Sequence, residues 1–263
     1  MKMKRILRLM TVILLVATVG GMPCAGKSAS ETEPSPPGAR RPIDTYSDVN
    51  ETDWFYDTLD ECWRKGLVDE SWNQEVDTGG VWDRFYPNVK MTRGAVIRAF
   101  GTMADYGELV DFLQYGEPGF VDWDDEDPLM SPKYWATGYH AVRHPKFYAW
   151  AEESGLVAGY GDHRFGPGDP VTRGQIAVIF DHAIGLFGEE TMQDAEPRRF
   201  TDHDKIPVWA EGSIQKLCKT GIVSGYPDGS FQPERQLTKV EFYQMLSSFM
   251  KYIQLDYKTA SWS

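Results

Sequence analysis

Cysteine, positive charge and long apolar runs are all scarce in this chain of 263 residues. It contains 3 cysteines, and its 27 lysines and arginines stand against 39 aspartates and glutamates, so the formal net charge is −12. An acidic surface repels nucleic acid and anionic membranes at long range, and we therefore expect no nucleic-acid partner. An anionic partner of another kind has to be held by a few locally placed cations.

The one marked apolar run, residues 9–19, is shorter than the roughly 20 residues that span a bilayer. It follows a basic stretch and precedes small residues, and that order predicts a secretory signal peptide over residues 1–26. Its cleavage removes four positive charges and no negative ones, which changes the net charge from −12 to −16 and leaves no membrane span. An uncleaved anchor and a lipid-modified Cys24 are the alternatives.

Residues 27–45 are rich in serine, proline and charge and have little to bury, which predicts a linker. After cleavage only Cys62 and Cys218 remain. They either form a disulfide in an oxidising compartment or stay buried as free thiols on apolar helix faces.

Three segments, 46–107, 120–188 and 200–250, repeat the same markers and leave a short tail at 251–263. Each opens with an aromatic residue, one intervening residue and an aspartate. Each later carries a threonine-led motif, MTRGA, VTRGQ or LTKVE, with a phenylalanine seven residues and a proline five residues before the threonine. Identical offsets in three places indicate an internal repeat.

Each segment has the pattern helix, loop, helix. The first helix is expected to end at a glycine that can adopt the left-handed conformation, at Gly66, Gly155 and Gly221. The second is expected to begin after an N-cap threonine, at Thr92, Thr172 and Thr238. Gln175 and Glu241 complete capping boxes in the second and third segments, whereas Ala95 cannot do so in the first. The apolar positions of the second helices are predicted to face the core.

These linked motifs resemble the S-layer homology family, whose repeats combine F-x-D, a tryptophan-led helix, G-L-V-x-G-Y-x-D-G-x-F-x-P and T-R-A-E. The third segment matches with GIVSGYPDGSFQPERQLTKVE and the second with GLVAGYGDHRFGPGDPVTRGQ, while the first departs in its middle. The resemblance implies a mainly α fold in which three helix-loop-helix repeats form one pseudo-three-fold domain around a central three-helix bundle.

The resemblance also implies a secreted protein of the cell wall or cell surface that binds an anionic, pyruvylated secondary cell-wall polysaccharide in grooves between its repeats. No catalysis and no metal or cofactor is expected. An adaptor whose repeats bind another cell-surface protein is the alternative function.

Ligand contacts carried over from the family motif fall on three kinds of position. The motif arginine corresponds to Arg93, Arg173 and Lys239. The other candidates are the loop glycines Gly159 and Gly225, the opening aspartates Asp48, Asp122 and Asp202, and the helix tryptophans Trp54, Trp209 and, less securely aligned, Trp135.

A physical argument leads to the same cations. The first turn of a helix carries partial positive charge, so a cation directly after the N-cap is locally disfavoured, yet all three segments have one. Free N–H groups together with that cation predict an anion site. The alternative is that each cation pairs with a neighbouring aspartate. The groove of Arg173 is favoured because its own segment has a capping box and Gly159, whereas the first segment has Glu70 and an insertion.

Two other kinds of residue have alternative readings. The opening aspartates are predicted to cap the turn that follows them through local backbone N–H groups, with ligand contact as the alternative. Trp54 and Trp209 either pack on their own loop or stack on sugar rings.

Two patterns that are typical of metal sites are incomplete. His140 and His144 have the spacing of one helix face but no third ligand, and the acidic run 122–127 lacks the glycine of a calcium loop. No carboxylate pair stands out as catalytic, and the sequence therefore predicts a binding protein and no enzyme.

Overall fold

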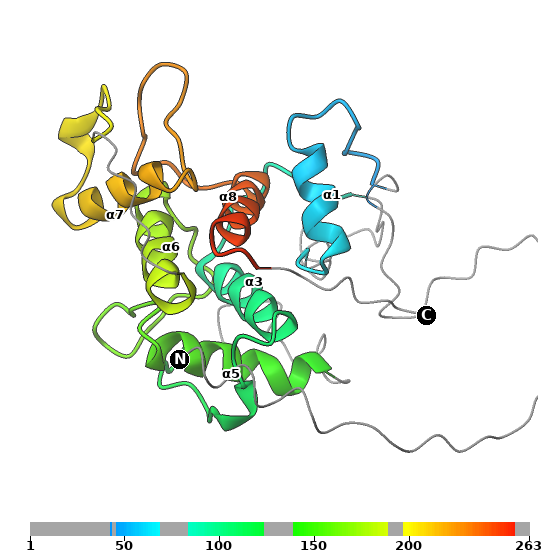
Figure 1. Ribbon diagram of the computed structural model, residues 1–263. Helices are drawn as coiled ribbons and strands as arrows, with labels where there is room; N and C mark the ends of the chain where they lie inside the picture. Colours follow the sequence, from blue (N-terminus) through cyan, green and yellow to red (C-terminus); the bar gives the residue numbers. More distant parts are fainter. Residues whose placement is uncertain (1–42, 44–45, 69–83, 124–138, 189–196, 256–263) are drawn as a thin grey trace, which may run out of the picture. The chain divides into compact units, whose positions relative to one another are not determined.

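A computed structural model describes residue 43 and residues 46–68, 84–123, 139–188 and 197–255, without the side chains of 139–144. The predicted signal peptide and Trp135 lie outside these ranges, as do Glu70 and the side chains of both histidines. Within the ranges the chain is mainly helical, as predicted, with α-helices, two 3-10 helices and isolated β-bridges (Figure 1). None of the helices described has the length and apolar character needed to cross a membrane.

The helices follow the predicted order. The first helices of the three segments are α1 (Tyr56–Arg64), α5 (Tyr139–Glu153) and α7 (Val208–Lys219). The second helices are α3 (Arg93–Tyr106), α6 (Arg173–Phe187) and α8 (Lys239–Tyr252). The 3-10 helices are η4 (Phe112–Gln114) and η6 (His203–Lys205).

The helix ends form as the sequence predicts. Thr92, Thr172 and Thr238 are N-caps, and the boxes with Gln175 and Glu241 are complete. The closing glycines of the first helices adopt φ values of +75°, +72° and +73°. Only glycine takes this left-handed conformation without strain, which explains why it recurs there.

The second helices meet in one aromatic core. Phe100 of α3 lies 5.0 Å from Phe180 of α6 and 5.8 Å from Phe249 of α8, between ring centroids. Phe180 lies 5.5 Å from Phe249. All predicted core positions of the second helices are buried, and burial of such apolar surface is the main stabilising term of the fold.

Each first helix packs on the second helix of a different segment. Helix α1 contacts α8, α5 contacts α3, and α7 contacts α6. Figure 1 shows α7 beside α6 and α5 beside α3. A single segment is therefore incomplete, because the partner of its first helix belongs to another segment.

Backbone hydrogen bonds close the three segments into a ring. The Met91 N–H donates to Leu237 O over 2.9 Å, the Leu237 N–H to Val171 O over 3.0 Å, and the Val171 N–H to Met91 O over 2.8 Å. Each of these residues directly precedes an N-cap threonine. The three equivalent positions thus bond to one another in a cycle, which is the arrangement expected of a pseudo-three-fold domain.

Two residues outside the predicted repeats belong to the folded core, and the free-thiol alternative holds for both cysteines. Ile43, placed in the linker, is 3% exposed and belongs to the core, so the folded unit begins before the first repeat marker. Phe112, between the first two segments, is buried 4.7 Å from the Phe147 ring. Cys62 and Cys218 are both free thiols, and burial raises the pKa of Cys62 to about 12.

Candidate functional site: the grooves between segments

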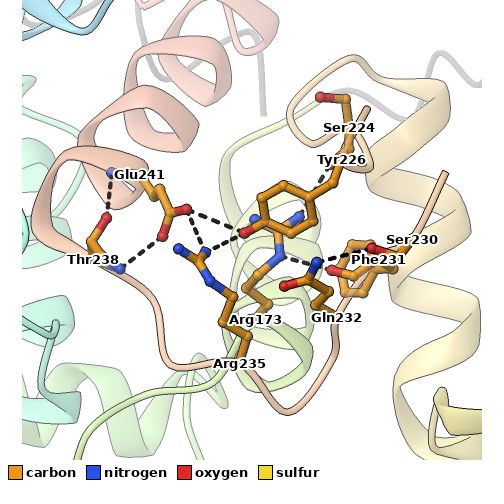
Figure 2. A network of polar contacts seen from close by, with 9 residues as sticks. All are labelled: Arg173, Ser224, Tyr226, Ser230, Phe231, Gln232, Arg235, Thr238 and Glu241. Carbon is orange, nitrogen blue, oxygen red and sulfur yellow. Dashed lines mark hydrogen bonds and ion pairs between the residues drawn. The ribbon is translucent and has the colours of Figure 1, made fainter. Parts of the chain in front are cut away.

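Arg173 extends from the start of α6 into the loop of the third segment. Its Nε donates to Phe231 O over 2.9 Å and its Nη2 to Ser224 O over 3.1 Å (Figure 2). The guanidinium also lies over the ring of Tyr226, with Cζ 4.6 Å from the ring centroid, and over that of Phe231 at 4.8 Å. The side chain is held by neutral carbonyl groups and ring faces.

The other two motif cations repeat this contact around the ring. Arg93 donates through Nε to Phe165 O over 2.8 Å and through Nη2 to Ala158 O over 2.9 Å, both in the second segment. Lys239 donates through Nζ to Phe85 O of the first segment over 2.9 Å. Each cation therefore donates hydrogen bonds to the loop of the next segment in the cycle and not to the loop of its own segment.

This cyclic arrangement corrects the predicted composition of the grooves. Arg173 was expected to share a groove with Gly159 of its own segment, but it meets the loop that contains Gly225. Arg93 meets the loop of Gly159 instead. Glu70 lies outside the described residues, and in sequence it belongs to the first segment, whose loop receives Lys239.

The N–H groups at the helix starts, which the predicted anion site takes to be free, have acceptors within the fold. At α6, the Arg173 N–H donates to Arg235 O over 2.9 Å and the Gly174 N–H to Pro233 O over 2.8 Å, while the Gln175 N–H is capped by Thr172 Oγ1 at 3.3 Å. The neighbouring segment thus supplies acceptors for N–H groups that would otherwise be free. The same arrangement recurs at the starts of α3 and α8.

The alternative, pairing of each arginine with a neighbouring aspartate, does not hold for the two arginines. Among the described residues, Arg93 and Arg173 form no ion pair, although they are only 7% and 6% exposed. Burial lowers the pKa of Arg173, an effect that the nearby Tyr226 and Glu241 partly offset. Both guanidinium groups therefore carry a positive charge that no carboxylate of the described residues contacts.

The opening aspartates hold the loop that precedes the second helix. Asp202 accepts from the Phe231 N–H and the Gln232 N–H, both over 2.8 Å. Asp122 accepts from Phe165 and Gly166 and Asp48 from Phe85 and Tyr86 in the same way. These partners lie 29 to 44 residues away, so the predicted local turn caps are wrong.

These aspartate contacts stabilise a strained backbone. Tyr86 and Gln232 adopt φ values of +57° and +59°, a conformation that is unfavourable for residues with a Cβ. Gly166 takes the same conformation at the equivalent position. Each carboxylate accepts from the N–H of this residue with one oxygen and from the preceding N–H with the other, so both oxygens are engaged within the fold.

The loop glycines are required by close packing. A Cβ on Gly225 would lie 2.8 Å from both Phe200 Cε1 and Ser230 O. One on Gly159 would lie 2.6 Å from Arg164 O and 2.9 Å from Phe120 Cε1. In the second and third segments the aromatic ring of the opening motif therefore packs directly on the loop glycine.

The tryptophans at the described positions are exposed. Trp54 is 67% exposed and Trp209 is 57% exposed, so packing on the loop accounts for little of either indole. Trp209 belongs to α7, and its indole reaches the start of α6, since a Cβ on Gly174 would be 3.4 Å from Trp209 Cη2. It therefore stands next to Arg173 in the chain's fold.

Residues that surround the motif arginines were missed by the sequence analysis, and we call them the rims of the predicted grooves. At the Arg173 groove, Arg235 donates to the Tyr226 hydroxyl and pairs with Glu241 (Figure 2). Burial raises the pKa of Glu241, but hydrogen bonds from Thr238 and Arg235 outweigh it and keep that pKa below its ordinary value. The recurring tyrosine after the loop glycine, in AGY and SGY, was the signal available.

At Arg93 the equivalent rim position carries a carboxylate in place of Arg235. There the Tyr160 hydroxyl donates to Asp169 Oδ2 over 2.7 Å. Asp169 and Arg235 occupy the same place, three residues before the N-cap threonine. The two grooves thus share one frame and differ in their rims.

A model of the S-layer homology domain matches residues 149–177 and 199–242. These residues include Arg173 and Lys239 and the loops of the second and third segments. The chain therefore contains S-layer homology sequence in its second and third segments. This match, together with relatives among surface layer proteins, assigns the protein to the cell wall or cell surface.

Three relatives show how this chain compares with longer proteins. It is 31% identical to a surface layer protein of Brevibacillus choshinensis over 127 residues, and 29% identical to a cellulosome-anchoring protein of Acetivibrio thermocellus over 107 residues. These alignments cover 48% and 41% of the chain but 11% and 24% of the relatives. An endoglucanase of a Bacillus species (strain KSM-635) is 24% identical over 252 residues, or 95% of the chain and 23% of the relative.

The chain therefore spans less than a quarter of the length of each of these relatives. The domain and the named relatives support a role in anchoring at the cell surface.

Proposed function

We propose that this protein is a non-enzymatic anchor that binds an anionic, pyruvylated cell-wall polysaccharide, with its main site in the groove of Arg173. The observation that carries the proposal is the buried, unneutralised guanidinium of Arg173. Burying a cation is costly unless its charge is compensated, and neutral carbonyl groups compensate only in part. A ligand carboxylate supplies the missing opposite charge.

The remaining donor of Arg173 is available for such a ligand. Nε and Nη2 are engaged by carbonyl oxygens, while Nη1 forms no hydrogen bond with the described residues. A carboxylate at Nη1 gains a charge-assisted hydrogen bond, which is stronger than a neutral one. The exposed indole of Trp209, at the same helix start, offers an apolar face to a sugar ring.

Rim charge favours this groove over the one at Arg93. Arg235 adds a second cation beside Arg173, although Glu241 partly neutralises it. Asp169 instead places a carboxylate near Arg93. The groove that receives Lys239 has Val89 at the equivalent position and neither rim charge.

The first segment is proposed to be a third, diverged repeat. Asp48, Thr92 and the contact from Lys239 reproduce the contacts of the other two segments. The catalytic name of the endoglucanase is not carried over, since the chain spans 23% of that relative and the described contacts all serve packing or the grooves.

The function is tested by sedimentation of the purified protein with cell walls of the organism that produces it. Binding is expected to disappear when the walls are stripped of polysaccharide and to survive protease treatment of the walls. Equal binding to bare peptidoglycan contradicts the proposal. Loss of binding only after protease treatment would favour the alternative function, an adaptor for another surface protein.

The site is tested by Arg173→Lys with Arg93→Lys as its matched control. Lysine is tolerated at the equivalent position 239, where it keeps one carbonyl contact, so both variants should fold. Calorimetric titration with a wall-derived polysaccharide fragment should show at least about a tenfold loss of affinity for Arg173→Lys, which corresponds to about 1.4 kcal/mol. Arg93→Lys should change the affinity less than about threefold.

A further inference from the structure

The three interfaces between a first and a second helix differ at one equivalent position. On the second helices this position lies nine residues after the N-cap threonine. It is occupied by Gly101 in α3, Asp181 in α6 and Ser247 in α8. Each of these residues faces the first helix that packs on its own helix.

At the interface of α6 with α7 the second helix is acidic. Asp181 Oδ1 lies 2.8 Å from Lys216 Nζ, and Asp181 Oδ2 accepts from Ser213 Oγ over 2.7 Å. The side chains of Lys216 and Asp181 are only 18% and 23% exposed. The pair therefore lies at a partly desolvated contact, where a wrong charge is costly.

At the interface of α1 with α8 the charges are reversed. Glu61 occupies the place of Lys216, five residues before the closing glycine. Its Oε2 accepts from Ser247 Oγ over 2.9 Å and lies 2.9 Å from Lys251 Nζ. Here the first helix supplies the carboxylate, and the second helix supplies two of its partners beside Lys65, which directly follows α1.

At the interface of α3 with α5 the match is steric. A Cβ on Gly101 would lie 2.3 Å from Cγ of Phe147, a buried residue eight positions before the closing glycine. Ser213 occupies the equivalent place in α7. Only glycine leaves room for the phenylalanine ring, so α5 requires a second helix without a side chain at this point.

We propose that these three contacts decide which first helix packs on which second helix. Placing α1 on α6 would bring Glu61 against Asp181, and placing α7 on α8 would bring Lys216 against Lys251. Placing α5 on α6 or α8 would drive Phe147 into Asp181 or Ser247. The native order alone avoids both like charge and steric overlap, which is how specificity is achieved against competing partners.

The apolar stripes cannot make this distinction by themselves. Each second helix offers a phenylalanine to the same core, as Phe100, Phe180 and Phe242 do. Helices α5 and α7 directly follow their partners in the chain, but α1 and α8 come from opposite ends of the folded unit. The matched contact is therefore most important where the ring closes.

The test transfers the contacts of one interface to another in the full chain. Lys216→Glu alone gives α7 the carboxylate of α1 and places it against Asp181. We expect the melting temperature to fall by about 5 °C or more. Adding Asp181→Ser and Gly185→Lys copies Ser247 and Lys251 into α6, and this triple variant should recover most of the loss.

The substitutions are suited to the site. Gly185 lies four residues after Asp181, as Lys251 lies four after Ser247, and a Cβ on Gly185 would meet nothing within 4 Å. Lys219→Glu makes the same charge change on the same helix away from this position and should shift the melting temperature by less than about 2 °C.

Two results overturn the proposal. One is a Lys216→Glu variant that melts like the Lys219→Glu control. The other is a triple variant that is no more stable than Lys216→Glu alone, including the case in which neither folds. Circular dichroism melts of the four proteins decide between these outcomes.

Discussion

The grooves at Arg173 and at Arg93 are built on the same buried frame. In both, a guanidinium bonds two loop carbonyl oxygens and an aspartate binds two N–H groups of the same loop. Their rims differ, because Arg235 lies at one and Asp169 at the other. The frame is fixed by folding, since removing any of its buried groups leaves a partner unsatisfied, whereas a rim charge can change at little cost in stability.

The strongest test of the shared frame is to remove the aspartates beneath the two grooves. Asp122→Ala leaves the buried N–H groups of Phe165 and Gly166 without acceptors and should cost about 3 kcal/mol. Asp202→Ala frees partly buried groups and should cost about 2 kcal/mol. Chemical denaturation measures both, and a loss below about 1 kcal/mol in either variant would show that the clamp is dispensable.

Both grooves depend on a closed ring, and acid should weaken its closing contact. Burial raises the pKa of Glu61, but hydrogen bonds from Lys65, Lys251 and Ser247 lower it to about 2. Because the folded pKa lies below the ordinary 4.5, this stabilisation is present above about pH 4.5 and is lost as pH falls toward 2. After allowance for solvent screening it amounts to roughly 2 kcal/mol.

Glu61→Gln is the matching variant for the acid test. It should be less stable than the parent at pH 6, with the difference shrinking as the pH approaches 2.5. A difference that stays constant over that range would mean that Glu61 does not titrate with folding. Thermal melts from pH 6 to 2.5 measure it.

Neutralising the rim charges should make the polysaccharide affinities of the two grooves more alike. Under the proposed function, Arg235→Gln should weaken polysaccharide binding about threefold to fivefold, or about 1 kcal/mol, through loss of a cation. Asp169→Asn keeps an acceptor for the Tyr160 hydroxyl and should strengthen the weaker groove by a similar factor. Calorimetric titrations at low and high salt measure both effects, which should shrink at high salt. Unchanged affinities would mean that the rims do not contact the ligand.

The smallest expected difference concerns the rim tyrosines. Tyr226→Phe removes a hydroxyl that bonds both Arg235 and Glu241 and should cost about 1 kcal/mol of stability. Tyr160→Phe removes a single exposed hydrogen bond and should cost less than about 0.5 kcal/mol. Denaturation curves measured side by side would contradict this order if Tyr160→Phe proved the more damaging.

Local features of the fold could be predicted from the sequence because they depend on neighbouring residues. The N-caps at Thr92, Thr172 and Thr238 and the left-handed closing glycines follow from hydrogen bonding and backbone sterics within a few residues. The core stripes follow from helical periodicity.

The candidate site could be predicted only in part. The motif cations were identified by position, but the partners expected for them were wrong, because sequence distance suggested the loop of the same segment. The aspartates were assigned to local turns for the same reason, although Asp202 binds N–H groups 29 and 30 residues away. Arg235 was missed because nothing in its local sequence distinguishes a rim residue from a surface cation.

The sequence by itself determined the secondary structure, the repeating unit and the positions of the buried cations, since these depend on short-range sterics and periodic burial. Only the tertiary structure decided that each cation bonds the loop of another segment and that each first helix packs on the second helix of another segment. The physical reason is that a single segment has more apolar surface and more backbone polar groups than it can satisfy alone. Closing the ring satisfies them, and the contacts that join one segment to the next have no signature in any one segment.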